Sequence, residues 1–130
     1  MPASRKKALR PQIPIVPARE ELRALVAAIE GELASWPQIR LSPMFGMTAV
    51  YRGKTIFGLL PKTRGLRSGD CLWVKLPNPT STIKKKLAAT PRILPPSSPS
   101  RAQWYTLSEV RAEDYRFLIE WLAIAHAAAK

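Results

Sequence analysis

The sequence holds few of the residues that catalysis and metal binding require. Its 130 residues include one cysteine, one histidine and nine acidic residues. A lone Cys71 excludes an intramolecular disulfide, fits a reducing compartment and is expected to be a small core residue. His126 has no Cys, Asp or Glu at ligand spacing, and no Ser-His-Asp, Cys-His or paired-carboxylate arrangement is indicated. We therefore expect a protein that is not an enzyme and that uses no metal and no cofactor.

Long apolar runs and phosphate-binding glycine motifs are missing as well. No apolar run approaches the roughly 18–20 residues that span a bilayer, and the basic N-terminus is not followed by the apolar stretch of a secretory signal. The sequence has no P-loop and no Gly-x-Gly-x-x-Gly motif. These absences predict a cytoplasmic protein with no membrane partner, and no small-molecule substrate is inferred.

Acidic residues are scarce where basic residues are common. Twenty-one Lys and Arg face nine Asp and Glu, for a net charge of +12. Residues 36–108 carry twelve basic residues against Asp70 alone, and residues 1–12 carry four basic residues and no acid. A positive field of this kind attracts the phosphates of nucleic acid, and it also keeps a protein in solution. Composition alone leaves both interpretations open.

Proline and hydrophobic periodicity divide the chain into an arm and one domain. Residues 1–17 contain four prolines among basic residues and are expected to form a mobile arm. Residues 18–130 are expected to form a single domain. One helix should begin near Ala18 and end at Trp36-Pro37, with these residues on its apolar face: Leu22, Leu25, Val26, Ile29 and Leu33.

Two more helices are expected. A short one should cover 81–89, with Thr80 or Ser81 as its N-cap. The last helix, over 112–128, carries two apolar stripes, so it must pack on a sheet and on either the first helix or a second copy of the chain. We favour the first helix.

Alternating segments predict antiparallel strands. Strands are expected at 44–51, 55–60 and 71–76, with Gly46 marking a bulge or a close backbone approach inside the first of them. A ten-residue basic loop at 61–70 should join the second to the third. A fourth strand is expected at 103–107, with Trp104 and Tyr105 on opposite faces. The pattern predicts an α+β fold: an antiparallel sheet of four or more strands, with N- and C-terminal helices packed on it.

The candidate nucleic-acid-binding residues are the cations of the arm, the basic loop and the short helix. Their expected role is electrostatic contact with phosphates, which weakens as salt rises. A solvated helix face is the other interpretation of the three consecutive lysines. The candidates are Arg5, Lys6, Lys7, Lys62, Arg64, Arg67, Lys84, Lys85 and Lys86.

An ordered set of motifs resembles the TfoX N-terminal domain family. Met44-Phe45-Gly46 resembles the family's opening Met-Phe-Gly-Gly, with Met47 in place of the second glycine. The likeness covers roughly residues 20–129. The other matching segments are the Arg52-Gly53-Lys54 turn, the strand Ile56-Phe57-Gly58-Leu59-Leu60, the strand Leu72-Trp73-Val74-Lys75-Leu76, the segment Trp104-Tyr105-Thr106-Leu107 and the helix from Asp114 to Ala125.

The resemblance implies a fold and bears on the function. It implies a YjbR/TfoX-N-like domain with a curved antiparallel sheet and helices packed on it. Full-length members of the TfoX group are linked to competence gene regulation, but their separate C-terminal domain has no counterpart here, so a regulatory role is not carried over. YjbR-like domains have a double-wing topology like that of DNA-binding proteins, which supports nucleic-acid binding by analogy of fold.

Two functional hypotheses have support in the sequence, and a third, a small enzyme or ligand-binding protein, would need a buried polar pocket that the sequence does not indicate. The first is a small non-catalytic domain that binds nucleic acid through a basic surface. The alternative is a protein-interaction or regulatory module, as a homodimer or with another protein. That module would use the apolar C-terminal helix or the proline-rich loop at 91–100.

Overall fold

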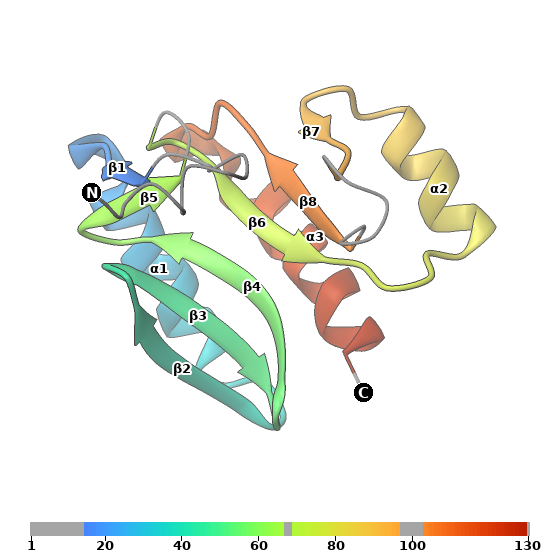
Figure 1. The fold of residues 1–130 in the computed structure, drawn as a ribbon, viewed down its shortest axis with the longest axis horizontal. Coiled ribbons are helices and arrows are strands. Elements are labelled where there is room, and N and C mark those ends of the chain that lie inside the picture. The colour runs from blue at the N-terminus through green and yellow to red at the C-terminus, as the bar shows by residue number, and fades with distance from the viewer. Residues whose placement is uncertain (1–14, 67–68, 97–102, 130) are drawn as a thin grey trace, which may run out of the picture.

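The computed structural model describes residues 15–66, 69–96 and 103–129 (Figure 1). Its strands are β1 Ile15–Pro17, β2 Ile39–Met44, β3 Met47–Arg52, β4 Thr55–Pro61, β5 Arg64–Leu66, β6 Leu72–Lys75, β7 Ile93–Leu94 and β8 Trp104–Leu107. Its α-helices are α1 Arg23–Leu33, α2 Ser81–Ala88 and α3 Tyr115–Ala128. The short helices η2 Glu20–Leu22 and η4 Ala112–Asp114 lead into α1 and α3.

Six of the described strands form one antiparallel sheet, and two form a separate ribbon. The sheet order is β2-β3-β4-β6-β8-β7, and β1 pairs with β5. Figure 1 shows α1 and α3 behind the sheet and α2 beyond its β7–β8 end. The prediction of an α+β fold, with an antiparallel multi-stranded sheet and N- and C-terminal helices, is confirmed.

The core lies between the sheet and the two long helices. All five residues of the predicted apolar face, from Leu22 to Leu33, are buried. On α3 the buried residues are Leu118, Trp121, Leu122 and Ala125. Because α3 contacts α1 as well as β4 and β6, its wide apolar surface is used within the chain, as expected. Fully burying one such side chain contributes about 1.5–3 kcal/mol.

The first predicted strand is wrong in its position. Phe45 and Gly46 form the two-residue turn between β2 and β3, with φ of +53° and +79°. Gly46 is therefore a turn residue and not a bulge inside a strand over 44–51, because positive φ at both central residues is the geometry of a tight hairpin. β2, which contains Pro43, was not predicted. Since β2 is an edge strand, a residue without an N–H is tolerated there.

The predicted ten-residue loop at 61–70 is partly a strand. β5 pairs with β1, whose residues were expected to lie in the proline-rich arm. Backbone hydrogen bonds from Ala18 N to Thr63 O and from Arg19 N to Gly69 O, both 3.2 Å long, continue this connection. The two segments approach closely, because a Cβ atom at Gly69 would lie 2.6 Å from the carbonyl oxygen of Pro17.

The remaining predicted elements are close to the observed ones. Thr80 caps α2, since its hydroxyl accepts a hydrogen bond from the N–H of Ile83 at 3.2 Å. The fourth strand and the last helix are β8 and α3, whereas the two-residue β7 was not predicted. Within the described residues, no helix has the length and apolar character needed to cross a membrane.

Candidate functional site

The strand register assigns side chains to the two faces of the sheet. A Cβ atom at Gly58 would lie 3.2 Å from the Leu122 side chain of α3, so Gly58 faces the helices. Its neighbour Leu59 therefore faces away from them, and so does Trp73, which is paired with Leu59 across β4 and β6. In the described part of the chain, this second face carries no helix (Figure 1).

Tyr51 lies on the same side of the sheet as Trp73. It stands between the buried Val50 and Arg52, whose Nη1 donates a hydrogen bond to the carbonyl oxygen of His126 on α3 at 2.8 Å. Alternation along β3 therefore directs the Tyr51 side chain away from the helices. The guanidinium of Arg40, its partner on β2, lies 4.0 Å from the centre of its ring, which is a cation–π contact.

Aromatic and basic side chains form a row across this side of the sheet. Tyr51 pairs with Ile56 on β4, and Lys75 on β6 pairs with Trp104 on β8. A pocket of about 150 Å³ lies beside Ile56 and Lys75 at the end of the sheet, and Ala128 and Ala129 at the end of α3 also line it. At ~4.8 Å between strands, the row from Arg40 to Trp104 is about 20 Å long. We name as the helix-free face these seven side chains: Arg40, Tyr51, Ile56, Leu59, Trp73, Lys75 and Trp104.

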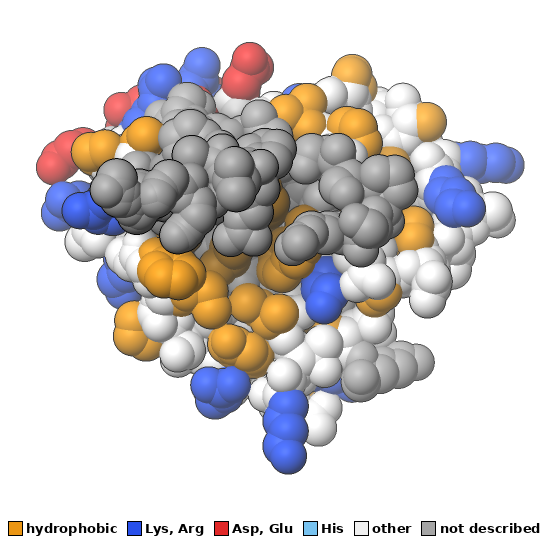
Figure 2. Space-filling model, in the orientation of Figure 1, with side chains coloured by type: hydrophobic (Ala, Val, Ile, Leu, Met, Phe, Trp, Pro, Cys, Tyr) orange, Lys and Arg blue, Asp and Glu red, His pale blue; other side chains and the backbone are white. Residues whose placement is uncertain are grey.

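The aromatic rings of the helix-free face are not part of the core. Among the described residues, Tyr105 packs against the buried core, whereas Tyr51, Trp73 and Trp104 do not, so the prediction that residues 104 and 105 point to opposite faces is confirmed. The rings of Trp73 and Trp104 lie 6.4 Å apart with an angle of 52° between their planes. Trp73 Nε1 is buried and has no hydrogen-bond partner in the described structure, which leaves a donor unsatisfied. Figure 2 shows hydrophobic side chains over β3 and β4, with Lys and Arg side chains beside them.

Charge is segregated between the strands and the rest of the chain. The described strands carry Arg40, Arg52, Arg64 and Lys75 but no Asp or Glu. All nine acidic residues are described, and they lie in the helices and connecting segments. The ion pairs on the described residues are Arg19–Glu21, Arg19–Asp70, Arg23–Glu20, Lys62–Glu30, Lys86–Glu120 and Arg92–Asp114. The helix-free face therefore presents cations without neighbouring carboxylates on its own strands.

The structure separates the cations predicted to bind nucleic acid. Lys62 and Arg64 lie at the β5 end of the molecule, and Lys84, Lys85 and Lys86 lie on α2 at the opposite end (Figure 1). Two of them are in ion pairs, Lys62 with Glu30 on α1 and Lys86 with Glu120 on α3. The other candidates, Arg5, Lys6, Lys7 and Arg67, are outside the described residues. The five described candidates do not form one continuous surface.

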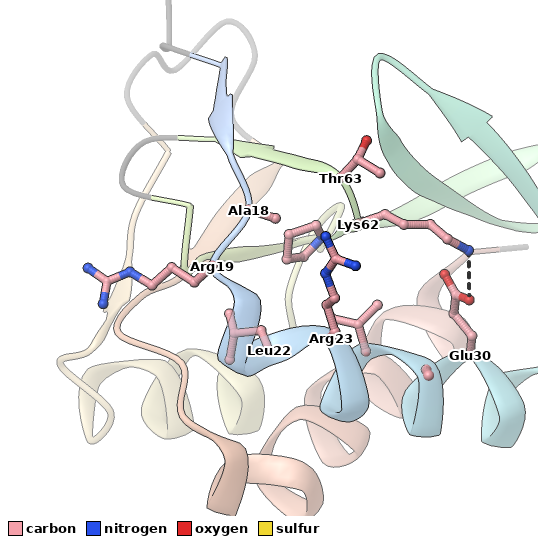
Figure 3. Close-up of a pocket in the computed structure, with 10 residues that line it drawn as sticks. Ala18, Arg19, Leu22, Arg23, Glu30, Lys62 and Thr63 are labelled. Atoms are coloured by element: carbon pink, nitrogen blue, oxygen red, sulfur yellow. Dashed lines mark hydrogen bonds and ion pairs between the residues drawn. The ribbon is translucent and has the colours of Figure 1, made fainter.

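A second hollow lies between α1 and the segment that joins β4 to β5. It has a volume of about 220 Å³, with Leu22 and Val26 among its apolar lining residues. Figure 3 shows Lys62 turned toward Glu30, while Arg19 extends away from the other labelled side chains. The Lys62 Nζ to Glu30 Oε1 distance is 3.3 Å, and Glu30 also accepts a hydrogen bond from Thr48 at 2.6 Å. The polar groups at this end of the pocket are thus engaged with each other.

The histidine and the cysteine, which catalysis or metal binding could use, are packed among other residues of the fold. Among the described residues, no group of three or more His, Cys, Asp or Glu is placed to hold a metal ion. His126 Nε2 lies 2.9 Å from the carbonyl oxygen of Pro37, and its ring contacts the edges of Trp36 and Phe57. Cys71 is buried, as expected. These surroundings indicate packing roles for the histidine and the cysteine.

Comparison with known proteins gives no relative from which a function follows. No family model, curated protein or solved structure matches the chain. The candidate site therefore depends on geometry alone. The sequence analysis did not identify this face. The available signal was the alternation of side chains along β3, β6 and β8, which is consistent with Tyr51, Trp73 and Trp104 on one side of a sheet.

Proposed function

We propose that the chain is a small non-catalytic protein that binds single-stranded nucleic acid on the helix-free face. One observation carries this proposal: a row of aromatic and basic side chains crosses five adjacent strands, and those strands contain no carboxylate. Aromatic rings on a sheet provide stacking platforms for bases, and nearby cations attract the phosphates. The charge segregation adds to this, because the acidic residues that would repel a nucleic acid lie elsewhere.

The individual side chains have distinct roles in this proposal. Trp104 stacks with a base, at about 1–3 kcal/mol, whereas the Arg40 guanidinium already covers one face of the Tyr51 ring. Lys75, which pairs with Trp104 across the strands, contacts a phosphate as a point charge. Arg40, held over the Tyr51 ring, presents its N–H groups to a second phosphate. Bases of a duplex are stacked on each other, so a single strand is the preferred ligand.

The proposal is tested by fluorescence anisotropy with labelled single-stranded DNA, single-stranded RNA and duplex DNA. Trp104→Leu should weaken single-strand binding by about fivefold or more. Lys75→Gln and Lys84→Gln are a matched pair, since each removes one positive charge. Lys75→Gln should weaken binding and reduce the salt dependence by about one phosphate contact, whereas Lys84→Gln should change Kd by less than about twofold.

Two results would overturn this proposal. One is no binding of any oligonucleotide at about 50 mM salt, where phosphate contacts are strong. The other is a loss of binding in Lys84→Gln or Lys85→Gln with no loss in Trp104→Leu, which would place the site on α2, as the charge pattern predicts. Circular dichroism of each variant establishes that it is folded.

The family relationship is a second part of the proposal. The element order supports a TfoX N-terminal-like, YjbR-like domain: a helix, a hairpin that turns at Gly53, a strand with Trp73, a strand with Trp104 and a last helix. An experimental structure of a TfoX N-terminal domain with a different strand order would argue against it. A regulatory role depends on this relationship and stays a prediction.

The protein-interaction alternative has less support from geometry. The most buried side chains of α3 are in the core, and the half-buried Phe117 is covered by the Arg92 guanidinium, 4.6 Å from its ring centre. Part of the proline-rich loop, residues 97–100, is outside the described residues. Light scattering distinguishes the alternatives, since a stable dimer without nucleic acid would favour interaction between proteins.

A further inference from the structure

The side chain of Phe45 is exposed and is not part of the hydrophobic core. Phe45 lies at the tip of the β2–β3 hairpin with 73% of its surface exposed, and it is the large hydrophobic residue left exposed in the described part of the chain. Single exposed hydrophobic residues are common and by themselves need no explanation. The backbone conformation of Phe45, however, does.

Phe45 adopts a φ of +53°, and Gly46 follows at +79°. A two-residue turn with positive φ at both positions favours Asn-Gly or Asp-Gly, and a bulky residue in the left-handed region is an outlier. Asparagine would satisfy this turn with less strain and without exposing a ring. The phenylalanine is therefore not explained by the stability of the hairpin.

The tip is also held firmly in place. The carbonyl oxygen of Gly46 accepts hydrogen bonds from the backbone N–H groups of Thr63 and Arg64, both at 3.0 Å, and from the Thr63 hydroxyl at 3.2 Å. A Cβ atom built at Gly46 would lie 2.9 Å from Cγ of Arg64, so the exposed Arg64 side chain packs against the turn. Phe45 and the aliphatic part of the Arg64 side chain thus adjoin one hydrogen-bonded turn.

We propose that Phe45 and Arg64 form a second nucleic-acid contact, in which Phe45 stacks with an unpaired base and Arg64 pairs with the adjacent phosphate. This inference rests on the proposed function. The tip lies at the end of β2 and β3, the strands that carry Arg40 and Tyr51. Phe45 is six positions from Tyr51, about 20 Å at 3.3 Å per residue, so the tip is within reach of a single strand that is bound at the helix-free face.

The combination of an exposed ring and a cation favours a nucleic acid over a purely apolar partner pocket. β2, β3 and β5 carry no acid, and Arg64 on β5 is their arginine at the tip, since Arg40 and Arg52 lie at the other end of the β2–β3 hairpin. An aromatic ring beside an unpaired arginine fits a base and its phosphate, because stacking and charge pairing then act on one nucleotide. In the described residues, no ion pair involves Arg64.

The test uses Phe45→Asn, which separates binding from folding. Asparagine suits the turn, so the thermal midpoint should stay the same or rise, while the Kd for a single-stranded oligonucleotide of about 12 nucleotides should increase by about fivefold or more. Phe45→Trp should bind at least as tightly as the wild type, because the larger ring stacks at least as well. Phe45→Leu, which keeps an apolar side chain without a ring, should lose binding as Phe45→Asn does.

The outcomes separate this inference from the proposed function. Unchanged binding in Phe45→Asn or in Phe45→Leu, with Trp104→Leu still impaired, overturns the tip contact and leaves the helix-free face in place. If Phe45→Asn lowers the thermal midpoint, the tip contact is judged from the Kd values of Phe45→Leu and Phe45→Trp alone. If the wild type binds no oligonucleotide, both proposals fail together.

Discussion

Replacing Asp114 with Asn should weaken the junction between β7 and α3. Arg92, which precedes β7, donates hydrogen bonds to both carboxylate oxygens of Asp114, at 2.7 Å from Nη2 and 3.3 Å from Nη1. The backbone N–H of Arg111 donates to the same carboxylate at 2.7 Å. The side chain of Asp114 is 13% exposed and that of Arg92 is 32% exposed, so solvent screens this pair less than it screens a surface ion pair.

The expected loss follows from these contacts. A hydrogen bond to a charged group contributes about 1.5–3 kcal/mol, and an asparagine oxygen retains one acceptor for Arg111. We therefore expect Asp114→Asn to lower the free energy of unfolding by about 2 kcal/mol at neutral pH. With a urea m-value of about 1–2 kcal/mol/M, the midpoint should fall by about 1–2 M. Glu113→Gln, which neutralises an exposed neighbouring carboxylate, is the control and should change little.

The pH dependence gives a sharper test than the loss itself. The hydrogen bond from Arg92, followed by that from the Arg111 N–H, holds the pKa of Asp114 below its ordinary value, against the opposing effect of burial. As pH falls, the unfolded chain binds this proton first, so the contribution is complete above the unfolded pKa of about 3.9 and is lost as pH falls through the folded pKa. Urea unfolding of wild type and Asp114→Asn should therefore begin to converge as pH falls below about 4. The same difference at neutral pH and at about pH 2.5 would refute this reasoning.

Two further predictions concern the backbone. Gly69→Ala should destabilise the fold by about 1–3 kcal/mol, because φ there is +83° and the new Cβ would lie 2.6 Å from the carbonyl oxygen of Pro17. Gly31→Ala, at an exposed helix position with no atom within 4 Å, should instead stabilise the fold by about 0.5–1 kcal/mol. Equal effects of the two substitutions on the thermal midpoint would contradict the close approach at Gly69. Thr80→Ala should cost about 1 kcal/mol in urea unfolding through loss of the α2 cap, with Thr80→Ser close to wild type.

The elements that sequence predicts well have local causes. The apolar face of α1 and the cap of α2 follow from side chains within a few residues of one another, so their patterns survive in the sequence. β1 and β5 are different, because each has three residues and is defined only by its pairing with the other, about fifty positions away. Pro17 suggested an arm without strands, but a proline can lie in a strand where the pairing does not require its N–H.

The candidate site was less predictable than the fold because charge pairing is non-local. The sequence shows Lys62 and Lys86 as members of basic clusters without acids nearby, whereas the fold brings Glu30 and Glu120 to them from α1 and α3. A count of charges along the chain therefore overstates how many cations are available for a ligand. Seven of the twenty-one basic residues, and none of the nine acidic ones, are outside the described residues, so the body described here is less basic than the whole chain.

Alternation along a strand identifies two sets of side chains but does not say which set the helices cover. Here Gly58 settles the question, because the absence of a side chain allows Leu122 of α3 to approach that side of β4. The residues that alternate with Gly58 and its neighbours across the sheet, Trp73 among them, must then lie on the opposite side. Two tryptophans and a tyrosine outside the core contribute little to holding the helices on the sheet. Their position beside Lys75 and Arg40, on strands without acids, is the observation on which the proposed nucleic-acid contact depends.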